Sequence, residues 1–207
     1  MINRRRMNIA GLCAAMPLMG GGITACSTTS PPVRWYRLPI ELPAGAAPPP
    51  AAPAARIWEL APMLPMPELL ERDTLLVEEG AAGIRLMHGH RWAEPLRDAL
   101  PRLLRHDLGL WLPGLWPTPA PAELQPAGSV QVELLALQGS LPLRQVRAGA
   151  RWVVTPGAAA GQGAATRALQ AEVQVPWTGA TAESLVLAQR AALWQLAGHI
   201  AASLATP

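Results

Sequence analysis

Alternation of hydrophobic and polar residues predicts the strands of the first half of the chain. The period is two at residues 33–40, where Trp35 and Tyr36 add aromatic side chains that favour strands, and again at 57–60. Two more strands, at 73–78 and 83–88, are separated by a short turn that suits a hairpin. The region before Trp92 is therefore expected to supply four strands.

From Trp92 the hydrophobic period lengthens to three or four residues, which predicts an amphipathic helix. Its apolar stripe consists of Trp92, Leu96, Leu100, Leu103 and Leu104, and its polar face of Arg97, Asp98, Arg102 and Arg105. Pro95 is tolerated in the first turn of such a helix. Pro101 lies inside it and removes a backbone donor, so we expect a kink there.

The second half of the chain repeats the order of strands followed by a helix. Alternation predicts strands at 129–137, 151–155 and 166–175, and an apolar stripe predicts one long helix at 181–204 with Thr181 as its cap. Proline-rich stretches at 43–55 and 113–126 are expected to be loops. This order predicts an α+β fold, a mostly antiparallel or mixed sheet with two main helices packed on one face.

The N-terminal segment has the order of a secretory signal. Three arginines precede an apolar run of about 15 residues, which is shorter than the roughly 20 residues of a membrane-spanning helix. Ile23, Thr24 and Ala25 then resemble the lipobox of bacterial lipoproteins, in which the next cysteine is acylated. We predict a lipoprotein signal peptide at 1–25 cleaved after Ala25, lipidation of Cys26, a tether at 26–32 and a single domain at 33–207.

The residues around the predicted anchor also indicate where the protein resides. In lipoproteins of this type an aspartate after the acylated cysteine favours retention in the inner membrane, and this chain has Ser27 there. We therefore expect a lipid-anchored protein on the periplasmic side of the outer membrane. Cys13 would leave with the signal peptide, so the mature chain would have one cysteine and no internal disulfide.

Composition narrows the choice of partners. The basic residues are 17 arginines and no lysine, and three of the arginines fall in the predicted signal, so 14 arginines face 14 acidic residues in the mature chain. A neutral chain lacks the basic surplus that binding to a phosphate backbone uses, and we exclude nucleic acid as a partner. Because Phe is absent and eight Trp are present, tryptophan is expected to fill the core.

Catalytic and metal-binding patterns are weak in this sequence. His88 and His90 have a spacing that metals can use, but two further ligands are not evident, and packed or solvated imidazoles are the commoner outcome. Residues 157–163 resemble a phosphate loop only in their glycine content, because no lysine follows, and are expected to be a turn. No catalytic, metal or cofactor-binding residue and no cofactor is predicted, so we expect a protein that is not an enzyme.

Short motifs along the chain resemble those of one family. The run Trp35-Tyr36-Arg37-Leu38-Pro39 is similar to the signature that follows the lipid anchor in PqiC-type lipoproteins, the auxiliary lipoproteins of ABC-type transport systems. Leu70-Glu71-Arg72 resembles that family's step into a strand, and Arg91-Trp92-Ala93-Glu94-Pro95-Leu96 matches its helix start almost letter for letter. The family-signature positions are Trp35, Tyr36, Leu38, Arg72, Arg91, Trp92 and Leu96.

This resemblance implies a non-catalytic role in transport. Such lipoproteins work beside an MCE-domain protein (the mammalian cell entry module) and an integral membrane partner, in systems linked to lipid movement between membranes and to envelope integrity. A homo-oligomer is also implied. The main alternative is a lipoprotein that stimulates a cell-wall synthase or an outer-membrane assembly machine, and genomic context would distinguish the two.

Arg72, Arg91 and Trp92 have two interpretations. They can form the surface that meets the MCE-domain partner, because Trp and Arg are favoured anchors of interfaces. Alternatively, Trp92 fills the core under the first helix while the arginines pair with Glu71, Glu94 or Asp98. The sequence favours this structural interpretation.

Overall fold

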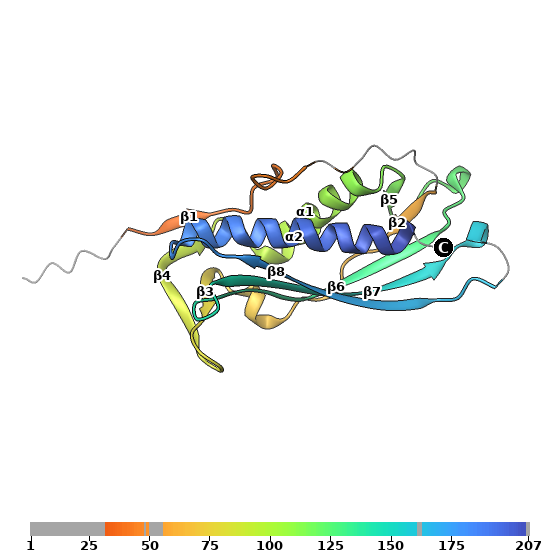
Figure 1. The fold of residues 1–207 in the computed structure, drawn as a ribbon. Coiled ribbons are helices and arrows are strands. Elements are labelled where there is room, and N and C mark those ends of the chain that lie inside the picture. Colours follow the sequence, from red (N-terminus) through yellow and green to blue (C-terminus); the bar gives the residue numbers. More distant parts are fainter. Residues whose placement is uncertain (1–31, 48, 50–55, 161–162, 206–207) are drawn as a thin grey trace, which may run out of the picture. The chain divides into compact units, whose positions relative to one another are not determined.

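Three long antiparallel strands from the second half of the chain form the centre of the sheet (Figure 1). The computed structural model describes residues 32–47, 49, 56–160 and 163–205. β6 (Gly128–Ser140) pairs with β7 (Gln145–Pro156), and β7 pairs with β8 (Arg167–Pro176). The three strands predicted in this region are confirmed, although β6 and β7 are longer than predicted.

The other edge of β6 carries two separate groups of strands, one at each of its ends (Figure 1). At its start, β2 (Trp58–Leu60) runs parallel to β6, and β5 (Leu115–Pro117) runs parallel to β2. At its end, β3 (Thr74–Glu78) runs parallel to β6 and forms an antiparallel hairpin with β4 (Ile84–Trp92). β1 (Arg34–Tyr36) completes this second group by pairing parallel with β4.

Two helices cover one face of this mixed sheet. α2 (Ala182–Ala205) lies along β6, β7 and β8, and α1 (Leu96–Trp111) packs beside α2 (Figure 1). Short 3₁₀ turns η1, η2 and η3 occur at Glu68–Glu71, Ala122–Leu124 and Ala158–Ala160. The predicted α+β class, with two helices on one face of the sheet, is confirmed. Neither helix in the described part of the chain combines the length and hydropathy needed to cross a bilayer.

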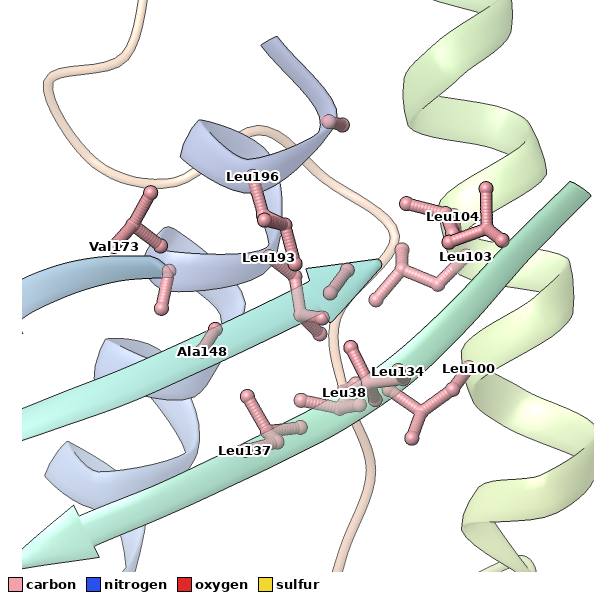
Figure 2. Packing of buried hydrophobic residues seen from close by; sticks show 14 of the residues in the cluster. Leu38, Leu100, Leu103, Leu104, Leu134, Leu137, Ala148, Val173, Leu193 and Leu196 are labelled. Carbon is pink, nitrogen blue, oxygen red and sulfur yellow. The ribbon is translucent and has the colours of Figure 1, made fainter. Parts of the chain in front are cut away.

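The core lies between the helices and the covered face of the sheet (Figure 2). Alternate residues of β6 from Val130 to Leu134 are buried, and a bulge after Leu134 returns Leu137 to the same face. Leucines of both helices complete this layer, among them Leu100, Leu104, Leu193 and Leu196. As the composition predicts, tryptophans are buried too, at positions 58, 92, 152, 177 and 194.

α2 begins where the sequence places its cap. The Oγ1 of Thr181 accepts a hydrogen bond from the Ser184 backbone N–H at 3.1 Å, which satisfies one donor of the first turn. Glu183 also lies in this turn, where a negative charge favours the positive end of the helix dipole. The prediction of Thr181 as the cap is confirmed.

Several predicted boundaries in the first half are wrong. α1 begins at Leu96 rather than near Trp92, because β4 continues through Trp92 to pair with β1, and Pro95 precedes the helix. β4 passes the predicted end at residue 88 because Gly89 adopts a φ of 75° at an irregularity in its pairing with β3.

Two loop or strand predictions also change. The strand predicted at 33–40 is reduced to Arg34–Tyr36, and β5 forms inside the proline-rich stretch 113–126. The other proline-rich stretch, 43–55, lies partly outside the described residues. α1 continues through Pro101, which lies inside the helix, and the kink expected there stays a prediction.

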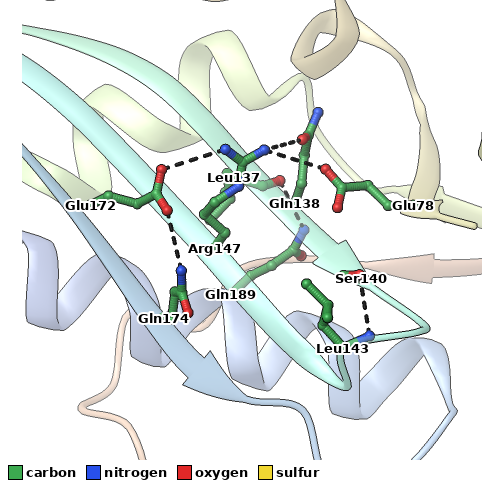
Figure 3. A network of polar contacts seen from close by, with 9 residues as sticks. All are labelled: Glu78, Leu137, Gln138, Ser140, Leu143, Arg147, Glu172, Gln174 and Gln189. Atoms are coloured by element: carbon green, nitrogen blue, oxygen red, sulfur yellow. Dashed lines mark hydrogen bonds and ion pairs between the residues drawn. The ribbon is translucent and has the colours of Figure 1, made fainter. Parts of the chain in front are cut away.

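The face of β6, β7 and β8 that the helices leave open has charged side chains that pair across strands, and Figure 3 shows those around Arg147. Arg147 of β7 reaches Glu172 of β8 and Glu78 of β3, with a nitrogen to oxygen distance of 3.4 Å in both pairs. Arg151 pairs with Glu133, its register partner on β6, at 3.0 Å from Nε. These contacts link strands across the open face, and the contact of Arg147 with Glu78 spans β6, which lies between β7 and β3.

Candidate functional site

The family-signature positions come together where β1, β3 and β4 meet the start of α1. Parallel pairing places Trp35 beside Arg91 and Tyr36 beside Trp92. Two backbone hydrogen bonds of 2.7 Å hold the junction: the Trp92 N–H donates to the Asp73 carbonyl, and the Ala93 N–H donates to the Tyr36 carbonyl. The motifs are thus far apart in sequence but form one structural unit.

Three signature residues belong to the core. Leu38, Trp92 and Leu96 are buried within the main hydrophobic cluster. Arg72 is exposed and lines, with Trp92 and Leu96, a small cavity of about 20 Å³ that has room for one water molecule. The structural interpretation of Trp92, as a side chain that fills the core, is confirmed.

Arg91 forms an ion pair, but with an acid that the sequence analysis did not name. Its guanidinium contacts the carboxylate of Asp73, which immediately precedes β3. Glu94 instead accepts two hydrogen bonds from Arg102, each of 2.7 Å. The prediction that the arginines pair with Glu71, Glu94 or Asp98 is therefore wrong for Arg91. Strand pairing, rather than helical spacing, brings its partner close.

His88 and His90 lie in different surroundings. His88 is exposed, whereas the Nδ1 of His90 is 2.9 Å from the Tyr36 hydroxyl, and the two rings pack at 5.5 Å between centroids. The positive φ of Gly89 interrupts the alternation between the two histidines. Within the described ranges, no three His, Cys, Asp or Glu side chains gather as metal ligands. The geometry favours a packing role for His90.

A buried ion pair that was not predicted from the sequence joins the two helices. Arg190 of α2 donates hydrogen bonds of 2.7 and 2.8 Å to the two carboxylate oxygens of Asp107 of α1. The same guanidinium donates to the backbone carbonyls of Ile40 and Glu41. Burial raises the pKa of Asp107, and the neighbouring Arg190 opposes that shift. The pair thus ties α1, α2 and the segment after β1 together.

Trp35 differs from the other signature aromatic residues because 62% of its surface is exposed. Trp35 lies in β1 and follows the predicted anchor, Cys26, closely in sequence. Ala25 and Cys26 lie outside the described residues. Signal cleavage and lipidation therefore stay predictions.

Two solved structures share this α+β architecture. One is the crystal structure of an uncharacterized protein, with a TM-score of 0.63 and 16% identity over 84% of this chain and 99% of the other. The second is protein XCC0632 from Xanthomonas campestris, of family DUF330, with a TM-score of 0.60 and 12% identity over 83% of this chain and 94% of the other. These similarities define the fold class. No curated protein matches the sequence.

The family itself is defined by sequence. The chain belongs to the family of ABC-type transport auxiliary lipoprotein components, which matches residues 36–201. The match runs from the end of β1 into the last turns of α2, and it confirms the resemblance seen in the motifs. The protein is therefore an auxiliary lipoprotein component of ABC-type transport, a role that associates it with a membrane of the cell envelope.

Proposed function

We propose that this lipoprotein serves an MCE-type system that moves lipid between the two membranes of the envelope. Acyl chains on Cys26 would hold it on the periplasmic face of the outer membrane, where it completes or docks the lipid conduit. The family match over residues 36–201 carries this proposal. The lipobox before Cys26, and Ser27 after it, support the anchor and the choice of membrane.

The surroundings of the titratable groups support a role without chemistry. Among the described residues, Asp107 is the one buried acid, and it is enclosed between the helices with both oxygens held by Arg190. A substrate could not reach this carboxylate without separation of α1 from α2. The side chains of the signature residues Leu38, Trp92 and Leu96 are likewise buried in the core.

Recovery of partners tests the transport role. The natively processed lipoprotein, tagged at its C-terminus, would be purified from gently solubilised envelopes and its partners identified by mass. We expect an MCE-domain protein together with a membrane-embedded transport subunit. Recovery of a cell-wall synthase or an outer-membrane assembly machine in their place would overturn the proposal. Light scattering on the same preparation tests the homo-oligomer that we also propose.

Two matched pairs of variants test the anchor and its membrane. Cys26→Ser should abolish acylation and release the protein from membranes, whereas Cys13→Ser, which changes a residue of the predicted signal, should leave both unchanged. Ser27→Asp should move the protein to the inner-membrane fraction, and Ser27→Ala should not. Retention of the Cys26→Ser protein in membranes would contradict the anchor.

A further inference from the structure

Exposed hydrophobic side chains concentrate at one end of β6. Ten large hydrophobic residues in the described part of the chain are exposed. Half of them lie on β1 and the residue before it, on the β3–β4 hairpin, or in the turn between β6 and β7. These residues form the hairpin surface, which consists of Val33, Trp35, Ile84, Leu86 and Leu143.

Strand register shows that residues of the hairpin surface share one side of the sheet. Thr74 and Leu76 are two residues apart on β3, so their side chains point the same way. Leu86 is the register partner of Leu76, and Arg91 is that of Thr74. Trp35 pairs in turn with Arg91. Trp35 and Leu86 therefore point to the same side, opposite the buried Leu75 and Val77.

Leu143 joins this surface from another part of the sequence. A cleft of about 480 Å³ separates the tip of the β3–β4 hairpin from the β6–β7 turn, and both Ile84 and Leu143 line it. Leu143 is 66% exposed. The hairpin surface thus draws on two turns and an edge strand, at the end of the sheet opposite β2 and β5 (Figure 1).

The charge around the hairpin surface suits anionic headgroups. Its three segments, residues 32–40, 73–92 and 140–147, contain six arginines and three acidic residues, with His88 and His90 in addition. The region around the exposed Leu110 and Trp116, residues 108–126, has one acidic residue and no arginine. Exposed tryptophan and leucine combined with arginine are typical of surfaces that lie in a membrane interface.

The distance from the predicted anchor indicates what the hairpin surface contacts. Seven residue steps separate Cys26 from Val33, and they can span at most about 25 Å. The start of β6, near Trp116, lies a further 35 Å or so along the strand from the end that carries β3, at about 3.3 Å per residue. A bilayer that holds the acyl chains is therefore within reach of the hairpin surface, which is the nearest apolar surface along the chain.

We infer that the hairpin surface rests on the membrane to which Cys26 is attached, with Trp35 and Leu86 inserted among the headgroups. This inference rests on the proposed lipid anchor. It gives the domain a defined orientation: β1 and the hairpin face the bilayer, and β2 and β5 face the periplasm. The occupant is the lipid surface, rather than a second copy of the chain.

Single-cysteine labelling tests this orientation, since the mature chain offers no free thiol once Cys26 is acylated. Trp35→Cys and Leu86→Cys would be labelled with a nitrobenzoxadiazole dye and compared with Trp116→Cys and Leu110→Cys. These controls have large apolar side chains, with 42 and 43% exposure against 41% for Leu86. Each protein, natively processed, would be reconstituted in vesicles of phosphatidylethanolamine and phosphatidylglycerol, with or without nitroxide (doxyl) groups on the acyl chains.

We expect nitroxide-labelled lipid to quench most of the dye fluorescence at positions 35 and 86 and to leave positions 110 and 116 unchanged. Equal quenching at all four, or none in vesicles that float with bound protein, would overturn the orientation but leave the anchor intact. A blue shift at 35 and 86 that grows with protein density, without quenching, would assign the surface to a second copy and also overturn it. Protein that fails to float would overturn the anchor, and this inference with it.

Discussion

The arginines on the two sides of the β6–β8 ladder differ in their exposure to water. On the helix side, Arg190 and Asp107 are removed from water, with side-chain exposures of 1 and 0%. On the open side, Arg147 and Arg151 remain accessible and pair across strands with glutamates. Burial of an ion pair has a large desolvation cost, and removal of one buried partner is strongly destabilising. An exposed ion pair contributes little to the free energy of unfolding. The same chemistry thus fixes the position of the helices on one face and only adds to strand pairing on the other.

Removal of one buried partner should have the largest effect. Arg190→Met leaves the Asp107 carboxylate without its guanidinium, and it removes the donors to the Ile40 and Glu41 carbonyls. We expect the free energy of unfolding in urea to fall by roughly 3–5 kcal/mol. The double variant Arg190→Met/Asp107→Leu should recover much of that loss. If it is as unstable as the single variant, the unpaired charge is not the cause.

A large cavity on the covered face should come next. Leu134 of β6 is 1% exposed and packs into the layer of leucines shown in Figure 2. Leu134→Ala should lower the free energy of unfolding by about 3 kcal/mol, from lost burial and the space left behind. Gln131→Ala, on the open face of the same strand, is the matched control and should change it by less than about 0.5 kcal/mol. Similar losses for both would remove the distinction between the faces.

The cap of α2 should have a smaller effect. Thr181→Ala removes the oxygen that accepts the Ser184 N–H, and should cost about 1 kcal/mol. Thr181→Ser keeps a hydroxyl at this position and should restore most of the stability. Thermal unfolding followed by circular dichroism measures both. An alanine variant as stable as the wild type would show that water satisfies the first turn equally well.

The exposed pair on the open face should matter least. Arg151→Ala removes the contact with Glu133 and should cost at most about 1 kcal/mol, because the arginine side chain is 55% exposed. The cost should shrink further when urea unfolding is repeated in high salt, which screens exposed charges. A loss as large as that of Arg190→Met, or one independent of salt, would contradict the contrast between the two faces.

The sequence predicted regular elements well where one simple pattern extended over many residues. β8 and α2 differ from their predicted bounds by one residue at each end, because alternation in one and capping in the other are local signals. β5 is only three residues long and lies among prolines, so it has no periodic pattern of its own. It forms because it pairs with β2, a segment far away in the sequence. The start of α1 was misplaced because Trp92 fits both the helical stripe and the end of β4.

The site was predictable in part for the same reason. Burial of Trp92 followed from its place in an apolar pattern, but the choice of Asp73 as the partner of Arg91 depends on how β3 and β4 pair. The sequence does contain a signal for the buried pair: Arg190 is the one arginine in α2, and it follows the buried Val186 by one helical turn. An arginine on the buried side of a mostly apolar helix is a candidate for a buried acidic partner.

The attachment of β3 to β6 has a mechanical consequence. The arm formed by β1, β3 and β4 is joined to the ladder by two register pairs, Val77 with Gly139 and Glu78 with Ser140, whereas β6 and β7 share twelve. Tension applied through β1 along β6 would load the long ladder in shear, with many bonds sharing the force. The short junction has few backbone hydrogen bonds to resist such a force, so the arm depends on its buried side chains, among them Leu75, Val77 and Trp92, to stay attached.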